Sequence, residues 1–209
     1  MKAAILVYEG TEPIDLATYG VLSMARRVAP EVSMFLVAER AGPVALANGL
    51  TVIADHGYAD APPADALIIT GGPGWERAAA SPATIDFVRR YSREACTAAV
   101  CTGGMILAAT GLLDGRAATT KREVAGNEVS PLALLRGRHP AVRAIDARLV
   151  DCGPVLTGGG VTLCIDMTLH LLARFHGEAA ARETARILEY SAALAANEAR
   201  LPAVAEAAA

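Results

Sequence analysis

The chain has 209 residues, a length typical of a single domain. With 53% hydrophobic and 20% charged residues, its composition is that of a folded globular protein and excludes intrinsic disorder. The net charge is −3 and the basic residues form no cluster, which argues against a nucleic-acid partner. No apolar run reaches the roughly 20 residues of a membrane span, and the N-terminal segment looks like a strand rather than a signal peptide. We therefore expect a cytoplasmic protein with no membrane partner.

Apolar segments alternate with amphipathic ones along the chain. In chain order, strands are expected at 3–8, 32–38, 66–69, 97–100, 142–145 and 149–156, with a hairpin of 44–47 and 50–54 around Asn48-Gly49. Helices are expected at about 13–29, 81–94, 102–110, 162–175 and 178–196. Segment 151–154 fits a continued strand or a turn equally well. The alternation predicts an α/β fold of the flavodoxin-like class, a doubly wound and mainly parallel sheet with helices on both faces.

The chain shows no internal repeat and no linker. We expect one domain over residues 1–200, followed by an Ala-rich tail over 201–209 that is disordered.

Three glycine-containing loops follow predicted strands, at 71–74, 101–104 and 158–160. Ligands of open α/β sheets bind at such strand ends. None of the loops has a phosphate-binding glycine pattern, so no nucleotide cofactor is expected. The second loop places Cys101 between a buried strand and a helix start, where a nucleophile is exposed and the helix N-terminus lowers a thiol pKa. The alternative is that Cys101 is a small buried apolar residue.

The other titratable residues give weaker signals. The four cysteines and four histidines lack the spacing of a metal site, so no metal is expected. Cys96, Cys152 and Cys164 are interpreted as packing residues. Asp15 fits either a site carboxylate or a first-turn carboxylate stabilised by the helix dipole, and Asp166 fits a helix-dipole or capping partner.

Several of these segments together resemble the ThiJ/PfpI superfamily. Segment 99–120 is similar to its nucleophile-elbow region, the loop 71–74 to its oxyanion loop, and Asp15 to its site carboxylate. Segment 156–166 completes a likeness that covers about residues 3–190. Within the superfamily, Cys101-Thr102-Gly103 together with Asp rather than Glu at position 15 is most similar to isocyanide hydratases. Thr102 stands where protease-like members have the histidine base.

The resemblance implies a cofactor-free hydration of isocyanides to N-substituted formamides. Cys101 would be the nucleophile that forms a thioimidate, and Asp15 the general acid and base. Such a double role requires a raised carboxyl pKa, which burial beside the thiol would give. Backbone N–H groups of Gly72, Thr102 and Gly103 would bind the substrate side of the site, and the Thr102 hydroxyl would hold water or the intermediate. The resemblance also implies a homodimer acting on a small-molecule substrate.

One departure from the superfamily pattern concerns the pocket. Isocyanide hydratases commonly have a His-Trp pair after the elbow helix, where this chain has Lys121-Arg122. Two cations would favour an anionic feature in the ligand if they face the site. Two alternatives therefore stay open, another Cys-dependent enzyme acting on α-oxoaldehydes or amide-like molecules, and a non-enzymatic ligand or redox sensor that uses oxidation of Cys101.

Overall fold

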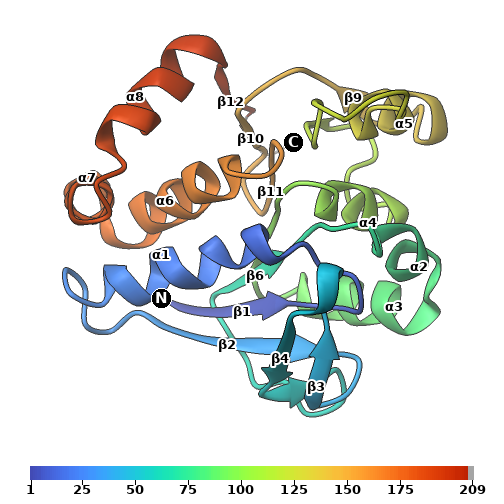
Figure 1. The fold of residues 1–209 in the computed structure, drawn as a ribbon, viewed down its shortest axis with the longest axis horizontal. Coiled ribbons are helices and arrows are strands. Elements are labelled where there is room, and N and C mark those ends of the chain that lie inside the picture. The colour runs from blue at the N-terminus through green and yellow to red at the C-terminus, as the bar shows by residue number, and fades with distance from the viewer. Residues whose placement is uncertain (207–209) are drawn as a thin grey trace.

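An eight-stranded sheet runs through the middle of the molecule in the computed structural model, which describes residues 1–206 (Figure 1). Its strand order is β12-β10-β11-β7-β6-β1-β2-β5, and every neighbouring pair is parallel except β10 and β11. The bounds are β1 Lys2–Leu6, β2 Ser33–Ala38, β5 His56–Gly57, β6 Ala66–Ile69, β7 Cys96–Ala99, β10 Leu149–Asp151, β11 Val155–Gly158 and β12 Ala203–Ala205. The structure thus confirms the predicted doubly wound, mainly parallel sheet.

The central strands are apolar on both faces because helices cover both faces. In register, Ile5 of β1 lies between Leu36 of β2 and Ile68 of β6, and Ile5 and Ile68 are completely buried. Continuous apolar strands of this kind are typical of buried parallel sheets.

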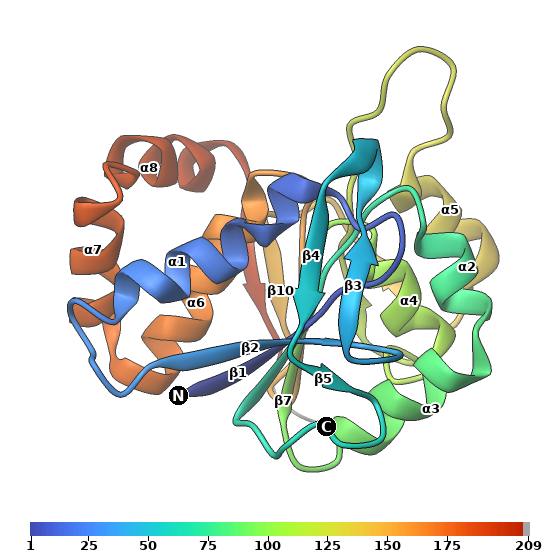
Figure 2. The ribbon, with the colours of Figure 1, turned by 60° about the horizontal axis from the view of Figure 1, so that its bottom comes forward.

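Figure 2 shows the sheet between two layers of helices. One layer holds α1 Ala17–Ala25, α6 Leu163–His176, α7 Glu178–Ile187 and α8 Ser191–Arg200, and the other holds α2 Trp75–Ala80, α3 Pro82–Tyr91, α4 Gly103–Ala109 and α5 Pro131–Arg138. Leu22 and Leu171 bring α1 and α6 onto one face of the sheet, while Phe87 and Ile106 bring α3 and α4 onto the other. A short 3₁₀ turn, η1 Pro13–Leu16, leads into α1.

Two small sheets flank the main one. The predicted hairpin is confirmed as β3 Gly42–Ala45 paired antiparallel with β4 Thr51–Ala54, with the short turn η2 Ala47–Gly49 between them. The expected strand at 142–145 shortens to β9 Arg143–Ala144 and pairs with β8 Ala117–Ala118 outside the main sheet.

Several local expectations are settled or changed. Segment 151–154 is a turn, because β10 and β11 pair antiparallel around it. The single helix expected at 178–196 is two helices, broken where Glu189 adopts a φ of 55°. Helices α2 and α5 were not expected, and both are short.

The C-terminal segment differs from the expected disordered tail. Residues 203–205 form β12 on the outer edge of β10, where Val204 packs against Ala117, Val150 and Cys152. The Glu206 carboxylate accepts a hydrogen bond from Ala117 N (3.0 Å) and pairs with Arg143. An unpaired strand edge next to a small apolar cluster gives the segment a place to bind. The rest of the expected tail, 207–209, lies outside the described residues.

The parallel strands end together on one side of the sheet, where β1, β6 and β7 lead into the loops that carry the candidate residues. Across residues 1–206, none of the helices combines the length and the apolar character needed to cross a bilayer.

Candidate active site

Cys101 lies at a sharp turn between β7 and α4 and has a φ of 53°. A non-glycine residue in this region is uncommon and marks a backbone held in place by its surroundings. Here the Cys101 N–H donates to Gly159 O (3.1 Å), and the Thr120 hydroxyl donates to Cys101 O (2.6 Å). A side chain at Gly103 would place its Cβ 2.3 Å from Ile69 O, so the turn needs glycine there. The chain thus builds the predicted strand-to-helix elbow.

Asp15 approaches Cys101 from η1 and is completely buried. Its Oδ2 accepts a short hydrogen bond from Gly71 N (2.6 Å). The other oxygen, Oδ1, makes no well-formed hydrogen bond within residues 1–206, while the Cys101 thiol is a nearby donor that lowers the pKa of this carboxyl. Buried polar atoms are almost always paired in folded proteins, so an open carboxylate oxygen beside a thiol is a feature that needs a reason.

The pKa values of the two groups reflect this shared environment. Burial is the main cause that raises the pKa of Asp15 to about 7, against the lowering effect of the Gly71 N–H bond. Burial, followed by the negative charge of Asp15, raises the pKa of Cys101 to about 12. The expected lowering of the thiol pKa at the helix N-terminus is therefore not what the structure shows, because desolvation outweighs the helix end. At neutral pH the thiol keeps its proton and Asp15 titrates.

Val161 is a site residue that the sequence analysis did not identify. Its backbone N–H and that of Thr102 both hydrogen-bond to the Cys101 sulfur and lower the pKa of the thiol. Val161 reaches this position with a φ of 53°, which is a true outlier for a β-branched residue. The preceding glycine loop at 158–160 was the available signal, but a left-handed valine is not visible in a sequence.

Thr102 and Gly72 are joined by two hydrogen bonds across the site. Gly72 N donates to Thr102 Oγ1 (2.8 Å), which in turn donates to Gly72 O (3.2 Å). Gly72 has a φ of 146°, and a Cβ there would lie 2.2 Å from Glu12 N. The N–H of Gly103 donates to Val100 O (2.9 Å). Because the N–H groups of Gly72 and Gly103 have partners within the protein, their expected role as substrate donors stays a prediction that requires these bonds to open.

Comparison with known proteins agrees with this geometry. A model of the DJ-1/PfpI family matches residues 1–174. The chain belongs to the DJ-1/PfpI family. It is 31% identical over 195 residues to an isonitrile hydratase of Pseudomonas putida, covering 92% of this chain and 80% of that one. It is also 31% identical over 137 residues to the HTH-type transcriptional regulator CdhR of Pseudomonas aeruginosa, covering 65% of this chain and 38% of the regulator.

A crystal structure of a ThiJ/PfpI family protein from Pseudomonas syringae superposes with a TM-score of 0.77 and 26% identity, covering 91% of this chain and 75% of that one. The alignment with the isonitrile hydratase covers most of this chain, which supports the assignment of the chain as an enzyme of the DJ-1/PfpI family.

Tyr8 is a second residue, close to Asp15 and Cys101, that the sequence analysis did not identify. It follows β1, and its buried hydroxyl makes no well-formed hydrogen bond within residues 1–206, although the Thr102 side chain is near enough to lower its pKa. Burial, then the negative charges of Asp15 and Cys101, raises its pKa, so the hydroxyl stays protonated and able to donate.

Asp166, expected as a helix-dipole or capping partner, is buried at the start of α6 in a network of its own. It accepts from Arg148 Nη1 (3.2 Å), Tyr190 Oη (2.8 Å) and Asn197 Nδ2 (3.1 Å). Cys164, on the same helix, is buried and donates to Ile14 O (3.7 Å). Within residues 1–206, no three His, Cys, Asp or Glu side chains meet as a metal site requires.

The two cations at the place of the His-Trp pair of isocyanide hydratases have different partners. The Lys121 side chain lies across Gly160, where an added Cβ would meet Lys121 Cγ at 2.5 Å, and its charge lowers the pKa of Cys101. Arg122 instead pairs with Asp146 and Glu123, both at 3.2 Å. Lys121 is therefore the cation on the Cys101 side.

Proposed function

We propose that this protein hydrates isocyanides to N-substituted formamides without a cofactor, with Cys101 as nucleophile and Asp15 as the group that moves the proton. The observation that carries the proposal is the open Oδ1 of a buried carboxyl beside a protonated thiol. Position 102 holds no histidine base, so Asp15 is the titratable group available for proton transfer at the sulfur.

The first step adds the thiol across the terminal carbon of the isocyanide. The Asp15 carboxylate accepts the thiol proton as the sulfur attacks that carbon, and it then delivers the same proton to the carbon. One S–H bond breaks, while a C–S and a C–H bond form, and the product is a thioimidate on Cys101. The N–H groups of Val161 and Thr102 stabilise the negative charge that develops on the sulfur.

The second step adds water. The Asp15 carboxylate takes a proton from a water molecule whose oxygen attacks the thioimidate carbon, and it passes that proton to the nitrogen, which leaves a hydroxyl on the carbon. Collapse of this intermediate breaks the C–S bond and releases the N-substituted formamide, while the hydroxyl proton moves through Asp15 to the sulfur. A carboxyl with a pKa of about 7 can act as base and acid in turn at neutral pH.

Turnover of an alkyl and an aryl isocyanide, with methylglyoxal alongside, tests the proposal. We expect formamide from the isocyanides, and a loss of at least about 10³-fold in Cys101→Ser because the nucleophile is gone. Cys164→Ser is the matched control, since it also removes a buried thiol near Asp15, and it should stay within about threefold of wild type.

Formamide production that survives in Cys101→Ser would contradict the proposal. Silence on isocyanides together with Cys101-dependent loss of methylglyoxal would assign the protein to the α-oxoaldehyde alternative. Silence on all three compounds would favour the sensor alternative.

A further inference from the structure

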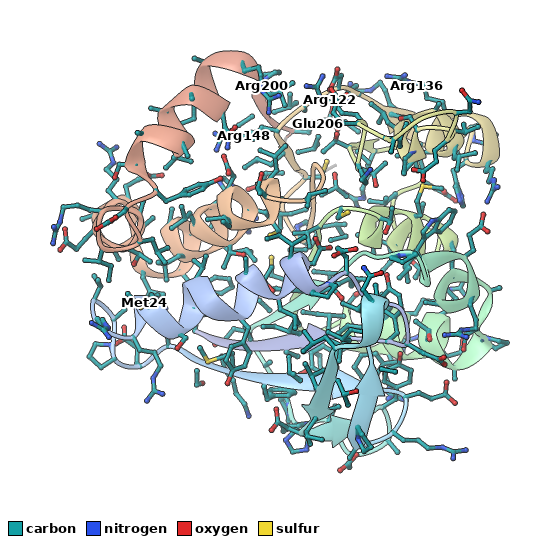
Figure 3. All side chains as sticks on the ribbon, in the orientation of Figure 1. Met24, Arg122, Arg136, Arg148, Arg200 and Glu206 are labelled. Atoms are coloured by element: carbon teal, nitrogen blue, oxygen red, sulfur yellow. The ribbon has the colours of Figure 1, made fainter. Side chains whose placement is uncertain are left out.

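A small hollow lies against the nucleophile loop and is lined by three basic side chains. Its volume is about 50 Å³, and its walls include Lys121, Arg122 and Arg200, one acidic residue, Glu123, and residues 159–161. Figure 3 places Arg122 and Arg200 at the same end of the molecule. A space of this size holds a carboxylate group or a few water molecules.

The hollow shares its floor with the nucleophile. Gly159 O accepts the N–H of Cys101, and the N–H of Val161 hydrogen-bonds to the sulfur, while both residues also line the hollow. Lys121, which lines the hollow, directly follows Thr120 in the chain, and the Thr120 hydroxyl donates a hydrogen bond to Cys101 O. Residues 159 and 161 thus contact Cys101 and also line the hollow, and the charge of Lys121 reaches the sulfur.

The charges around the hollow leave an excess of positive charge. Arg122 is compensated by Asp146 and Glu123, which are themselves largely exposed. The Lys121 ammonium donates to a neutral acceptor, the backbone carbonyl of Glu123. Arg200 has no carboxylate within ion-pair distance in the part of the chain that the structure describes. The one carboxylate that lines the hollow, Glu123, pairs with Arg122, so Lys121 and Arg200 are left without a carboxylate partner among the described residues.

We propose that this hollow binds an anionic group of the substrate, a carboxylate on the substituent of the isocyanide nitrogen, and that Lys121 is the residue that selects it. The identity of the reacting group rests on the proposed function. The hollow and its charges are independent of that proposal. A charge-assisted hydrogen bond from Lys121 and a second cation at Arg200 would favour an isocyano acid over its neutral ester.

The first arm of the test compares isocyanoacetate with methyl isocyanoacetate. The measured quantity is the ratio of kcat/KM for the acid to kcat/KM for the ester, in which any general effect on the thiol cancels. We expect this ratio to fall about 10- to 100-fold in Lys121→Met, as loss of a charged hydrogen bond predicts, and to be restored in Lys121→Arg. Arg136→Met is the matched control because it removes an exposed cation outside the hollow, and its ratio should stay within about twofold.

The second arm needs no turnover. Alkylation of Cys101 by iodoacetate and by iodoacetamide, followed by peptide mass spectrometry, compares an anionic with a neutral reagent of nearly the same shape. We expect the rate ratio of iodoacetate to iodoacetamide to fall about tenfold in Lys121→Met. An unchanged ratio in Lys121→Met would overturn the inference even if the protein hydrates isocyanides. A fall in the ratio with no isocyanide turnover would retain the anion-binding hollow and reject the hydratase proposal.

Discussion

Two buried aspartates, Asp15 and Asp166, show how the same residue type serves two purposes in one fold. Both are almost completely removed from solvent, and burial is the main cause that raises the pKa of each. Asp166 is surrounded by donors from Arg148, Tyr190 and Asn197. Asp15 has one backbone donor, Gly71 N, and an open oxygen.

The difference between the two carboxyls lies in their partners rather than in their burial. Asp166 connects α6 to α8 and to Arg148, the residue before β10, so its charge holds these segments together. Asp15 lies at the end of the parallel strands, beside Cys101, whose backbone is strained. A buried carboxyl whose partners are incomplete is available for chemistry, and one whose partners are complete is structural.

The largest difference that we expect between the two aspartates is in their effect on activity. Asp15→Asn should reduce isocyanide turnover by about 10³-fold, because an amide of the same shape cannot accept the thiol proton. Asp166→Asn should keep turnover within about tenfold when rates are normalised to the folded fraction. Rates measured side by side, with near-UV circular dichroism to report folding, check this. An equal loss in both variants would remove the distinction between them.

Stability as a function of pH sharpens the same comparison. The folded-state pKa of Asp15 is raised from 3.8 to about 7, so folding takes up a proton in this window. Stability therefore falls as pH rises from about 4 to about 7, by about 4 kcal/mol in total, at about 1.4 kcal/mol per pKa unit. Asp15→Asn should lack this decline and gain stability over wild type as the pH increases. Urea unfolding of both proteins at about pH 5 and about pH 8 measures it, and parallel curves would contradict the prediction.

Replacing Asp166 should lower the stability of the fold, the opposite of the effect expected for Asp15→Asn at neutral pH. Asp166→Asn should destabilise the fold by about 3 kcal/mol, because it leaves the buried Arg148 guanidinium with only the half-exposed Glu198 as a carboxylate partner. Urea unfolding near neutral pH tests this, with Glu198→Gln as the comparison that removes the exposed partner and should cost less than about 1 kcal/mol. A loss from Asp166→Asn no larger than that from Glu198→Gln would mean that the network does not brace the helices.

The pH dependence of activity is the smallest of these effects. The competent form has an ionised Asp15 and a protonated thiol, so kcat/KM should rise about tenfold between about pH 6 and about pH 8 with an apparent pKa near 7. The profile of Asp166→Asn should be the same. A rate that falls over this range would indicate that protonated Asp15 is the required form.

Much of the fold follows from the sequence, because apolar runs and Gly or Pro boundaries are local signals. The parallel sheet, the hairpin around Asn48 and the elbow at Cys101 are of this kind. The assignment of Asp15 and Cys101 to the site rested on the family resemblance, and it stays a prediction, while the structure places the two residues side by side. The break at Glu189 and the pairing of 203–205 depend on tertiary packing that leaves no local pattern.

The electrostatics of the site could not be predicted in the same way. The helix N-terminus predicted a lowered thiol pKa, but the depth of burial, which only the fold determines, reverses the direction. The N–H groups facing the sulfur belong to Thr102 and Val161, and the second depends on a strained backbone angle. The homodimer and the cytoplasmic location stay predictions, which light scattering and fractionation would check.

The protonation of Asp15 is the most direct test of the account, because the mechanism depends on a carboxyl that titrates near neutral pH. Infrared difference spectra of wild type minus Asp15→Asn, recorded across a pH series, isolate the carbonyl stretch of the protonated Asp15 carboxyl. The account predicts a band that disappears with a midpoint near pH 7. A midpoint near the ordinary aspartate value of about 4 would contradict it, since Asp15 would then be unable to return a proton at neutral pH.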